Sequence, residues 1–463
     1  MNSLYTDVAI IGAGSAGLTA YRAAIAAGKR AVLIEGGPYG TTCARVGCMP
    51  SKLLIAAAEA AHSAQHAGAF GVRVAGVEID GRAVMARVRS ERDRFVGFVV
   101  EGVEGIPEAD RLRGYARFID NTVLQVGDDT VVHATRVVIA TGSTPVIPSM
   151  LQGLGDRLVV NDDVFAWDDL PASVAVFGPG VIGLELGQAL ARLGVRVRVF
   201  GRSGSLGSLT DPAIRAAAEA IFKQEFALET RATIHAVQRE GDEVVVTFTG
   251  DDGARATERF AYALAATGRA PNVKGLGLEH SGLTLDAAGV PVFDPRTLQA
   301  GTAPVFIAGD ANDVLPLLHE AADEGRAAGH NAATWPDLTP LSRRAPIAVV
   351  FSDPGIALVG KHFDELAADS HVVGEVSFHN QGRSRVMLQN RGLMHVYADK
   401  ASGRFLGAEW IGPRAEHIAH LLAWAYQQQL TLAQMLAMPF YHPVVEEGLR
   451  TALRDAAAKL KPA

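Results

Sequence analysis

Two cysteines stand with four residues between them in the segment from Gly40 to Lys52, and they are the only cysteines in the 463-residue chain. A disulfide between Cys43 and Cys48 would close so small a loop that it would remove little entropy from the unfolded chain, so stability is a poor reason for the pair. The alternatives are two small buried apolar side chains or half of a structural zinc site, and the chain has no second cysteine pair to complete such a site. The spacing favours a pair that cycles between dithiol and disulfide.

A histidine near the end of the sequence is placed to act as a base. His442 precedes Pro443, and Glu447 follows in the first turns of an expected amphipathic helix. The carboxylate can reach back to orient the imidazole, and a histidine held in this way is a general base poised near neutral pH. Taken alone, His442 would more often be one of 14 ordinary histidines. The thiols elsewhere in the chain favour the functional interpretation.

The cysteine segment is expected to lead into a helix that has Pro50 in its first turn and runs through Lys52 to about His66, because proline suits the first turn of a helix. Cys48 then lies at the helix N-terminus, where the helix dipole lowers the pKa of a thiol. Lys52 follows one turn later on the same face. Its ordinary interpretation is a solvated surface lysine, but its place beside the thiols favours a buried functional role. Glu185 lies among apolar residues of a later helix, where a carboxylate is costly unless paired, and a lysine is the obvious partner.

The first βαβ unit predicted by the sequence lies at the N-terminus. A buried strand over residues 7–11 leads directly into Gly12, Gly14 and Gly17, and a helix and a second strand ending at Glu35 follow. Glycines at this spacing allow a tight turn, close approach of the backbone to a pyrophosphate, and packing of the helix on the strand. Glu35 is placed to accept hydrogen bonds from a ribose diol. The order of these parts predicts dinucleotide binding more strongly than the glycines alone.

A second βαβ unit begins with a strand over residues 174–177 and the glycines Gly178, Gly180 and Gly183. Two such motifs in one chain imply two dinucleotides. The second strand of this unit ends in Gly201 and Arg202 rather than in an acid. An acid there binds the 2′-hydroxyl of NAD, whereas an arginine suits the 2′-phosphate of NADP. The segment therefore modestly favours NADP. The other interpretation is that Arg202 is merely exposed to solvent.

Further strands are expected before Thr141 and before Gly309. The segment over residues 305–310 is expected to end another strand, and Asp310 at its carboxyl end is well placed to meet a flavin ribityl or phosphate group. A helix over residues 317–328 carries His319. Prolines after residue 144 mark a domain boundary, and the pattern changes to alternating strands and then helices after Pro340.

Composition restricts the class of protein. The formal net charge is −7, from 43 Lys and Arg against 50 Asp and Glu, which argues against a nucleic-acid surface. The first residues show no secretory signal pattern, and the apolar runs are too short to span a bilayer. With so few cysteines, the expected location is a reducing cytoplasm, where a disulfide is usually catalytic.

Together these motifs resemble the class I flavoprotein pyridine nucleotide–disulfide oxidoreductases, and among them the dihydrolipoamide dehydrogenases most closely. The resemblance covers essentially the whole chain, through the segments GAGSAG, TTCARVGCMPSK, ATGS, GPGVIGLELG, ATGRAPN, IAGDAND and YHPVVEE. It implies a glutathione-reductase-like α/β fold with two Rossmann-like domains, one for FAD and one for NAD(P), and a C-terminal α+β dimerisation domain. The implied boundaries are 1–148 and 268–340 for the FAD domain, 149–267 for the NAD(P) domain, and 341–463 for the dimerisation domain.

The resemblance also implies catalytic roles. Cys43 is the thiol that exchanges with substrate sulfur, and Cys48 is the thiol against the flavin. His442 is the base for Cys43 and would come from the other subunit of a homodimer. Lys52 pairs with Glu185 beside the flavin.

Two sets of cofactor-binding residues are implied in the same way. Those for FAD are Gly12, Gly14, Ser15, Ala16, Gly17, Glu35, Thr41, Thr42, Lys52, Ala116, Thr141, Gly142, Ser143, Gly309, Asp310 and His319. Those for NAD(P) are Gly178, Gly180, Val181, Ile182, Gly183, Glu185, Gly201, Arg202, Gly268 and Arg269.

The leading hypothesis is a dihydrolipoamide dehydrogenase that passes electrons between a lipoyl-type dithiol, on a small molecule or another protein, and NAD(P) through the cysteine pair and FAD. An alternative, motivated by Arg202, is an NADPH-dependent reductase of another small-molecule or protein disulfide. A third is a thiol-based redox sensor with a structural flavin. The sequence shows no C-terminal cysteine pair, which argues against the mercuric reductases, and Pro50, Ser51 and Lys52 fit the lipoamide branch better than the glutathione branch.

Overall fold

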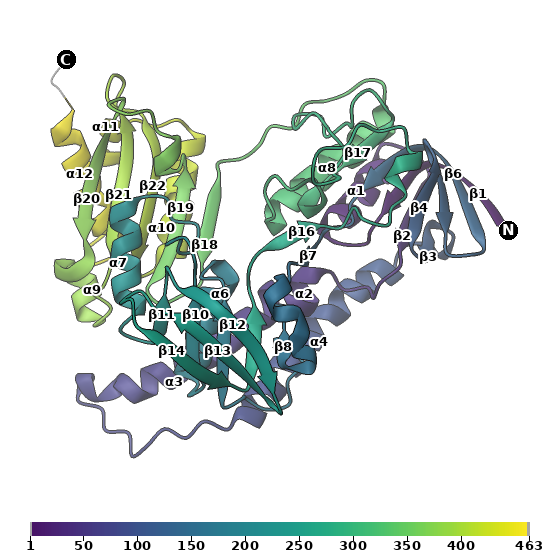
Figure 1. The fold of residues 1–463 in the computed structure, drawn as a ribbon. Helices are drawn as coiled ribbons and strands as arrows, with labels where there is room; N and C mark the ends of the chain where they lie inside the picture. Colours follow the sequence, from purple (N-terminus) through teal and green to yellow (C-terminus); the bar gives the residue numbers. More distant parts are fainter. Residues whose placement is uncertain (1, 461–463) are drawn as a thin grey trace. The chain divides into compact units, whose positions relative to one another are not determined.

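The structure is a computed structural model that describes residues 2–460 (Figure 1). The chain divides into two compact units, which are described separately. The first contains residues up to Leu53, residues 86–146 and residues 268–343. The second contains residues 54–85, residues 147–267 and the residues from Arg344 onward. Two helices have parts in both units, α3 (Cys48–His66) and α4 (Gly81–Glu104).

The first unit is built on a seven-stranded sheet whose order is β3-β2-β1-β6-β5-β4, with β17 paired to β6. Strands β3, β2, β1, β6 and β17 are parallel, whereas β5 and β4 run antiparallel to their neighbours. The strands are β1 (Asn2–Ile11), β2 (Ala31–Glu35), β3 (Arg111–Arg113), β4 (Ala116–Asp120), β5 (Val123–Val126), β6 (Thr130–Ile139) and β17 (Val305–Ile307). The same unit contains the pair β7 (Ser143–Pro145) and β16 (Arg269–Pro271), and the helices α1 (Ser15–Ala26), α2 (Thr42–Val46) and α8 (Leu318–Thr334).

The second unit contains a five-stranded parallel sheet of order β11-β10-β9-β15-β8 and a three-stranded antiparallel sheet. The strands of the parallel sheet are β8 (Leu158–Val159), β9 (Ser173–Phe177), β10 (Arg196–Phe200), β11 (Ala227–Glu229) and β15 (Tyr262–Ala265). The antiparallel strands are β12 (Thr233–Glu240), β13 (Glu243–Thr249) and β14 (Arg255–Phe260). Helices α5 (Asn161–Val164), α6 (Val181–Arg192) and α7 (Pro212–Phe222) belong to the same segment.

The C-terminal part of the second unit is an antiparallel sheet with helices packed on it, as the alternating pattern after Pro340 predicts. Its strand order is β18-β19-β22-β21-β20. The strands are β18 (Ile347–Val350), β19 (Gly355–Gly360), β20 (His371–Ser377), β21 (Leu393–Asp399) and β22 (Phe405–Gly412). The helices are α9 (Gly382–Val386), α10 (Ala415–Gln427), α11 (Leu432–Leu436) and α12 (Glu446–Lys459).

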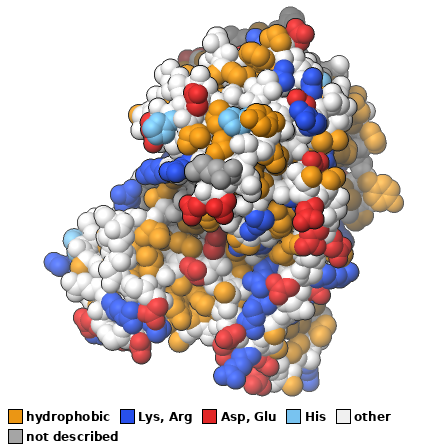
Figure 2. Space-filling model, turned by 90° about the vertical axis from the view of Figure 1, so that its right-hand side faces the viewer, with side chains coloured by type: hydrophobic (Ala, Val, Ile, Leu, Met, Phe, Trp, Pro, Cys, Tyr) orange, Lys and Arg blue, Asp and Glu red, His pale blue; other side chains and the backbone are white. Residues whose placement is uncertain are grey.

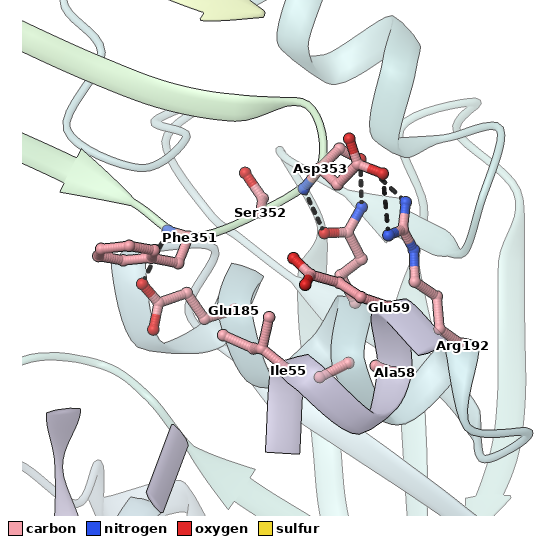
Figure 3. Close-up of a pocket in the computed structure, with 10 residues that line it drawn as sticks. Ile55, Ala58, Glu59, Glu185, Arg192, Phe351, Ser352 and Asp353 are labelled. Atoms are coloured by element: carbon pink, nitrogen blue, oxygen red, sulfur yellow. Dashed lines mark hydrogen bonds and ion pairs between the residues drawn. The ribbon is translucent and has the colours of Figure 1, made fainter. Parts of the chain in front are cut away.

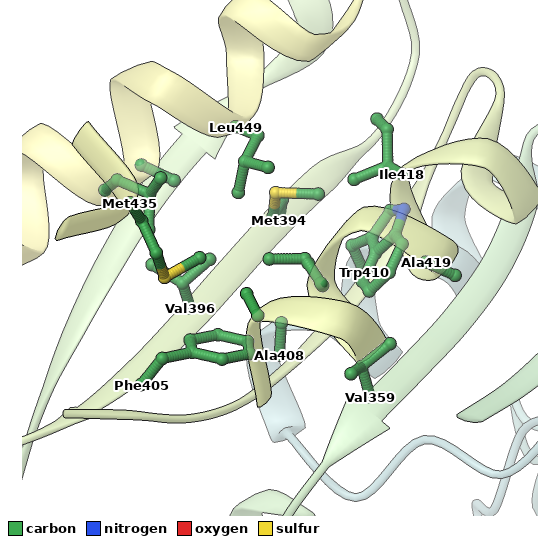
Figure 4. Packing of buried hydrophobic residues seen from close by; sticks show 14 of the residues in the cluster. Val359, Met394, Val396, Phe405, Ala408, Trp410, Ile418, Ala419, Met435 and Leu449 are labelled. Atoms are coloured by element: carbon green, nitrogen blue, oxygen red, sulfur yellow. The ribbon is translucent and has the colours of Figure 1, made fainter. Parts of the chain in front are cut away.

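A single apolar core joins this sheet to its helices. Figure 4 shows the Trp410 ring of β22 beside Ile418 and Ala419 of α10, and Met394 of β21 towards Leu449 of α12. Trp410 and Met394 are fully buried. Helices α10 and α12 therefore cover one face of this sheet. The opposite face carries His395 and Glu409, which contact Asp211 at the start of α7.

The surface of the molecule carries charges of both signs. On the face drawn in Figure 2, Lys and Arg side chains are intermingled with Asp and Glu side chains. None of the helices within residues 2–460 is long and apolar enough to cross a membrane.

Helices α1 and α8 of the first unit pack closely because small residues face each other. A Cβ atom added at Gly325 would overlap the carbonyl oxygen of Ala16, and one added at Gly329 would overlap that of Ala20. Gly325 and Gly329 are four residues apart and both are buried. The contact requires glycine at both positions, since neither backbone can move away without disturbing the sheet beneath it.

This close contact predicts opposite effects for two glycine-to-alanine changes in helices. Gly329→Ala is expected to destabilise the protein by about 1–3 kcal/mol through overpacking. Gly97→Ala, in α4 where an added Cβ meets nothing within 4 Å, is expected to be neutral or to stabilise by up to about 1 kcal/mol. Thermal unfolding of the two variants checks this, and equal effects would contradict the packing described here.

Candidate functional site

The parallel strands of the first unit end at one edge of the sheet, and most of the residues predicted to bind FAD follow those ends directly. The last residue of β6, Ile139, is in register with Ile11 of β1 and with Ile307 of β17. Ile11 is in turn in register with Ile34 of β2. Ligands bind at the carboxyl edge of such sheets. The residues after these ends are Gly12, Gly14, Ser15, Ala16 and Gly17, then Glu35, then Thr141, Gly142 and Ser143, and finally Gly309 and Asp310.

The first glycine motif has the geometry that a pyrophosphate requires. Gly12 has φ +107°, and a Cβ there would overlap the carbonyl oxygen of Ala140. A Cβ at Gly17 would overlap the carbonyl oxygen of Gly12, so this glycine permits the close contact of helix and strand. Gly14 faces open space, with nothing within 4 Å of an added Cβ. It lies at the N-cap of α1, where backbone N–H groups attract phosphate.

Two polar groups at this edge, the Glu35 carboxylate and the Thr141 hydroxyl, bear on whether the site fits FAD. The carboxylate of Glu35 accepts hydrogen bonds from the amides of Ala13 (2.8 Å) and Gly37 (2.7 Å), which fixes it at the end of β2. The Thr141 hydroxyl oxygen is buried and has no hydrogen-bond partner within residues 2–460. A buried hydroxyl without a partner costs free energy, and a bound dinucleotide would supply the missing hydrogen bond. The residues present therefore fit FAD.

Asp310 is fixed by a chain of side chains that the sequence predicted only in part. Ser143 Oγ donates to Asp310 Oδ2 (2.7 Å), and Arg269 donates from Nε to Ser143 Oγ (2.8 Å) and from Nη2 to the Ser143 carbonyl oxygen (2.7 Å). Arg269 is there because β16 pairs with β7. The structure thus places Gly268 and Arg269, predicted for NAD(P), in the first unit beside residues predicted for FAD. Their role towards the nucleotide stays a prediction.

A buried carboxylate that sequence analysis missed holds the loop of Asp310. Glu324 of α8 accepts hydrogen bonds from the Gly309 amide (2.8 Å) and from Asn312 Nδ2 (2.7 Å), and it pairs with Arg343 (2.6 Å). Its side chain is 1% exposed. The only signal in the sequence was an acid among small apolar residues of a helix, and its partners come from separate segments.

The remaining residues predicted for FAD lie elsewhere in the first unit. Ala116 is buried at the start of β4, and His319 is exposed at the second residue of α8. Thr42 begins α2, and Thr41 is its N-cap, whose hydroxyl accepts a hydrogen bond from the Ala44 amide (3.3 Å). Thr41 has φ +58°, a strained conformation for a β-branched residue.

The two cysteines lie on either side of the junction between α2 and α3. Cys43 is in α2 and half-buried, while Cys48 is the first residue of α3 and exposed, as the sequence predicts for a thiol at a helix N-terminus. The two thiols are reduced. A hydrogen bond to Cys48, together with burial, raises the pKa of Cys43 well above its usual range. Cys43 therefore keeps its proton while sharing it with Cys48, and the proximity that a reversible disulfide requires is present.

Lys52 and Glu185 belong to different units. The Lys52 ammonium lies 3.4 Å from Ser51 Oγ in the second turn of α3. Glu185 is 4% exposed in α6 and accepts a hydrogen bond from the Phe351 amide (2.9 Å). Their predicted pairing stays a prediction.

The second glycine motif repeats the geometry of the first. Gly178 has φ +109° and faces the carbonyl oxygen of Ala266, Gly180 faces open space, and a Cβ at Gly183 would overlap the Gly178 carbonyl oxygen. Val181 and Ile182 form the first turn of α6. This repetition fits a second dinucleotide.

The end of β10 explains why no acid follows it. A Cβ added at Gly201 would lie 2.7 Å from Pro179 Cγ and 2.9 Å from the Thr230 carbonyl oxygen, so a larger residue does not fit. Arg202 next to it is exposed. Arg231, from another loop, packs its guanidinium against Gly204. Two arginines thus lie around the loop where a nucleotide ribose is expected.

The predicted His–Glu pair is present in the second unit. His442 Nδ1 lies 3.0 Å from Glu447 Oε2, and the other carboxylate oxygen accepts from Arg450 Nη2 (2.9 Å). The His442 side chain is 78% exposed, so the imidazole is accessible to solvent. Desolvation opposes ionisation of Glu447, but the hydrogen bonds from His442 and the Val444 amide and the charge of Arg450 hold its pKa below the usual range.

Comparison with known proteins agrees with this geometry. A family model described as pyridine nucleotide-disulphide oxidoreductase matches residues 6–325, and the dimerisation domain of the same family matches residues 347–453. A mercuric reductase of Shigella flexneri is 34% identical over 464 residues, which covers 96% of this chain and 80% of that protein. A dihydrolipoyl dehydrogenase of Halobacterium salinarum is 31% identical over 468 residues, which covers 97% of this chain and 96% of that protein.

Solved structures share the fold. An HOCl-induced flavoprotein disulfide reductase of Escherichia coli superposes with a TM-score of 0.81 at 23% identity, covering 98% of this chain and 100% of that one. LpdA of Mycobacterium tuberculosis gives a TM-score of 0.83 at 24% identity, covering 98% and 99% of the two chains. Because mercuric reductases and dihydrolipoyl dehydrogenases are both about 30% identical to this chain, identity alone does not choose between these two activities.

The contact with Arg450 predicts the pH behaviour of the His–Glu pair. Because the pKa of Glu447 is lowered in the folded protein, its ionised carboxylate stabilises the fold. This contribution to stability is present above the unfolded-state pKa and is lost as the pH falls through the folded-state pKa. Arg450→Met removes a cation, so Glu447 is expected to protonate at a higher pH than in the wild type. A ¹³C NMR titration of labelled glutamate, assigned with Glu447→Gln, measures this. Arg454→Met on the same helix is the control, and an unchanged Glu447 titration in Arg450→Met would contradict the prediction.

Proposed function

The chain belongs to the pyridine nucleotide-disulphide oxidoreductase family, whose members use FAD and NAD(P)H, and we propose that it is a dihydrolipoyl dehydrogenase-like enzyme acting on a lipoyl-type dithiol. The observation that carries the proposal is the thiol pair, in which Cys43 shares its proton with Cys48 at the start of α3. The chain is an oxidoreductase of disulfides, and the dithiol substrate is the proposed part. A reducing cytoplasm is its proposed location.

The proposed reaction begins with the cysteines as a disulfide. His442, fixed by Glu447, takes the proton of an incoming thiol, and the thiolate attacks the sulfur of Cys43, which releases Cys48 as a thiolate. The second thiol of the substrate then attacks the substrate sulfur of the mixed disulfide and releases Cys43. The substrate leaves as a disulfide, and its two electrons remain in the cysteine pair. FAD supplies the two-electron transfer between this pair and the nicotinamide.

The chain's own residues set the conditions for this exchange. Cys48 at a helix N-terminus is stabilised as the leaving thiolate by the helix dipole. Cys43 keeps its proton in the reduced pair because the hydrogen bond to Cys48 and burial raise its pKa. The family's dimerisation domain, over residues 347–453, supports a homodimer, in which the base for Cys43 is proposed to come from the other subunit.

A second candidate is an NADPH-dependent reductase of another disulfide, and one observation favours it. Gly201 leaves no room for the acid that binds the 2′-hydroxyl of NAD, and Arg202 is exposed beside it. A 2′-phosphate would be attracted to Arg202 and Arg231. This candidate shares the cysteine chemistry and differs in the nucleotide and in the direction of electron flow.

The proposed function predicts the same outcome for substitution of either cysteine. Cys48→Ser and Cys43→Ser should each abolish turnover of lipoamide with either nucleotide, because neither variant can form the disulfide. Both should still bind FAD and still pass electrons from reduced nucleotide to ferricyanide, which needs no thiol. Steady-state assays of the purified flavoproteins measure this, and lipoamide turnover at the wild-type rate in Cys48→Ser would overturn the proposal.

The expected preference for NADPH over NADH gives a separate prediction. Arg202→Gln should lower the ratio of kcat/KM for NADPH to that for NADH by about tenfold, which corresponds to about 1.4 kcal/mol of lost charge interaction. Arg215→Gln in α7 is the control and should leave the ratio unchanged. Initial rates with lipoamide and with glutathione disulfide separate the two candidate functions. A wild-type enzyme with a strong preference for NADH would remove the argument from Arg202.

A further inference from the structure

Three buried polar residues lie along one face of α6, and all of them hold the same turn. Glu185, Gln188 and Arg192 are three and four residues apart in sequence, which places them on one stripe of a helix, and they are 4%, 4% and 8% exposed. The turn over residues 351–354 connects β18 and β19. Figure 3 shows Glu185 and Arg192 reaching this turn at Phe351 and at Asp353.

The contacts of Gln188 and Arg192 bind the turn at several points. Gln188 Oε1 accepts a hydrogen bond from the backbone N–H of Asp353 (2.8 Å), and Gln188 Nε2 donates one to the backbone carbonyl oxygen of Asp353 (2.8 Å). Arg192 donates to the Asp353 carboxylate (3.1 Å) and to the same carbonyl oxygen (3.0 Å). Both polar groups of the Asp353 backbone are therefore occupied by side chains of one helix. Two residues earlier, the Phe351 amide donates to Glu185 Oε1 (2.9 Å).

A second layer of charges holds Arg192 from the other side. Glu225 accepts hydrogen bonds from Arg192 Nε and Nη2 (both 3.0 Å), from Gln188 Nε2 (2.9 Å) and from Arg391 (2.9 Å). Burying an arginine between two carboxylates costs desolvation energy, and apolar residues of similar volume often hold two segments together as firmly. The charged contacts also fix the orientation of the turn relative to Arg192, because each N–H donor of the planar guanidinium points in a set direction.

The same turn and helix line a small pocket together with the second half of α3. Ile55, Ala58 and Glu59 of α3 line it with Glu185 and Asp353 (Figure 3), and Gln188 lines it as well. Burial and the nearby Asp353 carboxylate raise the pKa of Glu59. Side chains of α3 after residue 54 thus lie beside the turn that contacts Glu185.

We propose that Gln188 and Arg192 are positioning residues: they fix the 351–354 turn so that the Phe351 amide directs the Glu185 carboxylate. The proposal rests on the proposed function, in which Glu185 acts with Lys52 beside the flavin. It makes a turn of the dimerisation domain a part of the arrangement that sets the speed of electron transfer from the nucleotide. The competing explanation is that these contacts only join two segments of the fold.

The test compares Gln188→Leu with a control that breaks another buried contact of the second unit. Gln188→Leu keeps the side-chain volume but removes both hydrogen bonds to Asp353. Thr210→Val is the control, because the hydroxyl of Thr210, in the loop before α7, donates to the buried Glu409 carboxylate of β22. Four quantities are measured for each FAD-loaded protein: the melting temperature, the visible flavin spectrum, hydrogen exchange of a peptide covering residues 347–354, and the rate of flavin reduction by NADH or NADPH in stopped flow.

A positioning role predicts that Gln188→Leu raises hydrogen exchange at residues 351–353, shifts the flavin spectrum, and slows flavin reduction by about tenfold, while KM for the nucleotide changes by less than about twofold. Thr210→Val should lower the melting temperature and leave the other three quantities at wild-type values. In a double-mutant cycle, Glu185→Gln combined with Gln188→Leu should be no slower than Glu185→Gln alone.

Two results would overturn the positioning role. One is a Gln188→Leu protein whose melting temperature falls while its spectrum and reduction rate match the wild type. The other is full additivity in the double-mutant cycle. A wild-type protein whose flavin neither nucleotide reduces would instead remove the proposed function, and the positioning role with it. Flavin reduction does not require the cysteines, so a failure of lipoamide turnover alone leaves this test decisive.

Discussion

Parallel strands that end in register place their following residues at one edge of a sheet, and this constraint organises both glycine motifs of the chain. In the first unit, β1, β2, β6 and β17 end together, so residues as distant in sequence as Gly12 and Asp310 lie at one edge. The carbonyl oxygens of Gly12 and Gly178 are each covered by a glycine of the following helix, and no side chain fits between them. The two motifs repeat because the same sterics apply to each.

Around this edge the candidate site residues are held by hydrogen bonds from their neighbours. Glu35 is held by two backbone amides, and Asp310 by Ser143, itself held by Arg269. In the second unit, Glu185 accepts a hydrogen bond from the Phe351 amide. A carboxylate with bound oxygens keeps its direction, and pre-organised groups lose less entropy when a ligand arrives. These polar contacts therefore fix the direction of the carboxylates for which a role towards the cofactors is proposed.

Sequence reasoning predicted the local features and missed the distant ones. The spacing of His442 and Glu447 predicted their contact because both lie within two turns of one another. The start of α3 at the cysteines followed from Pro50. Nothing in the sequence could pair Gln188 with Asp353, which are 165 residues apart, or Glu324 with the Gly309 amide. The position of Arg269 beside Ser143 depends on the pairing of two three-residue strands, which carry almost no pattern of their own.

The central claim is that Cys43 and Cys48 form the disulfide that exchanges electrons with the nucleotide. Because the chain has only two cysteines, a count of reactive thiols in the unfolded protein tests the claim without assigning signals. The oxidised flavoprotein is treated anaerobically with NADH or NADPH, unfolded under acid quench, and its thiols are counted with a chromogenic disulfide or by mass after alkylation. The account predicts no thiols per chain before reduction and two after it. A count that stays unchanged after the flavin has been reduced by the nucleotide would contradict it.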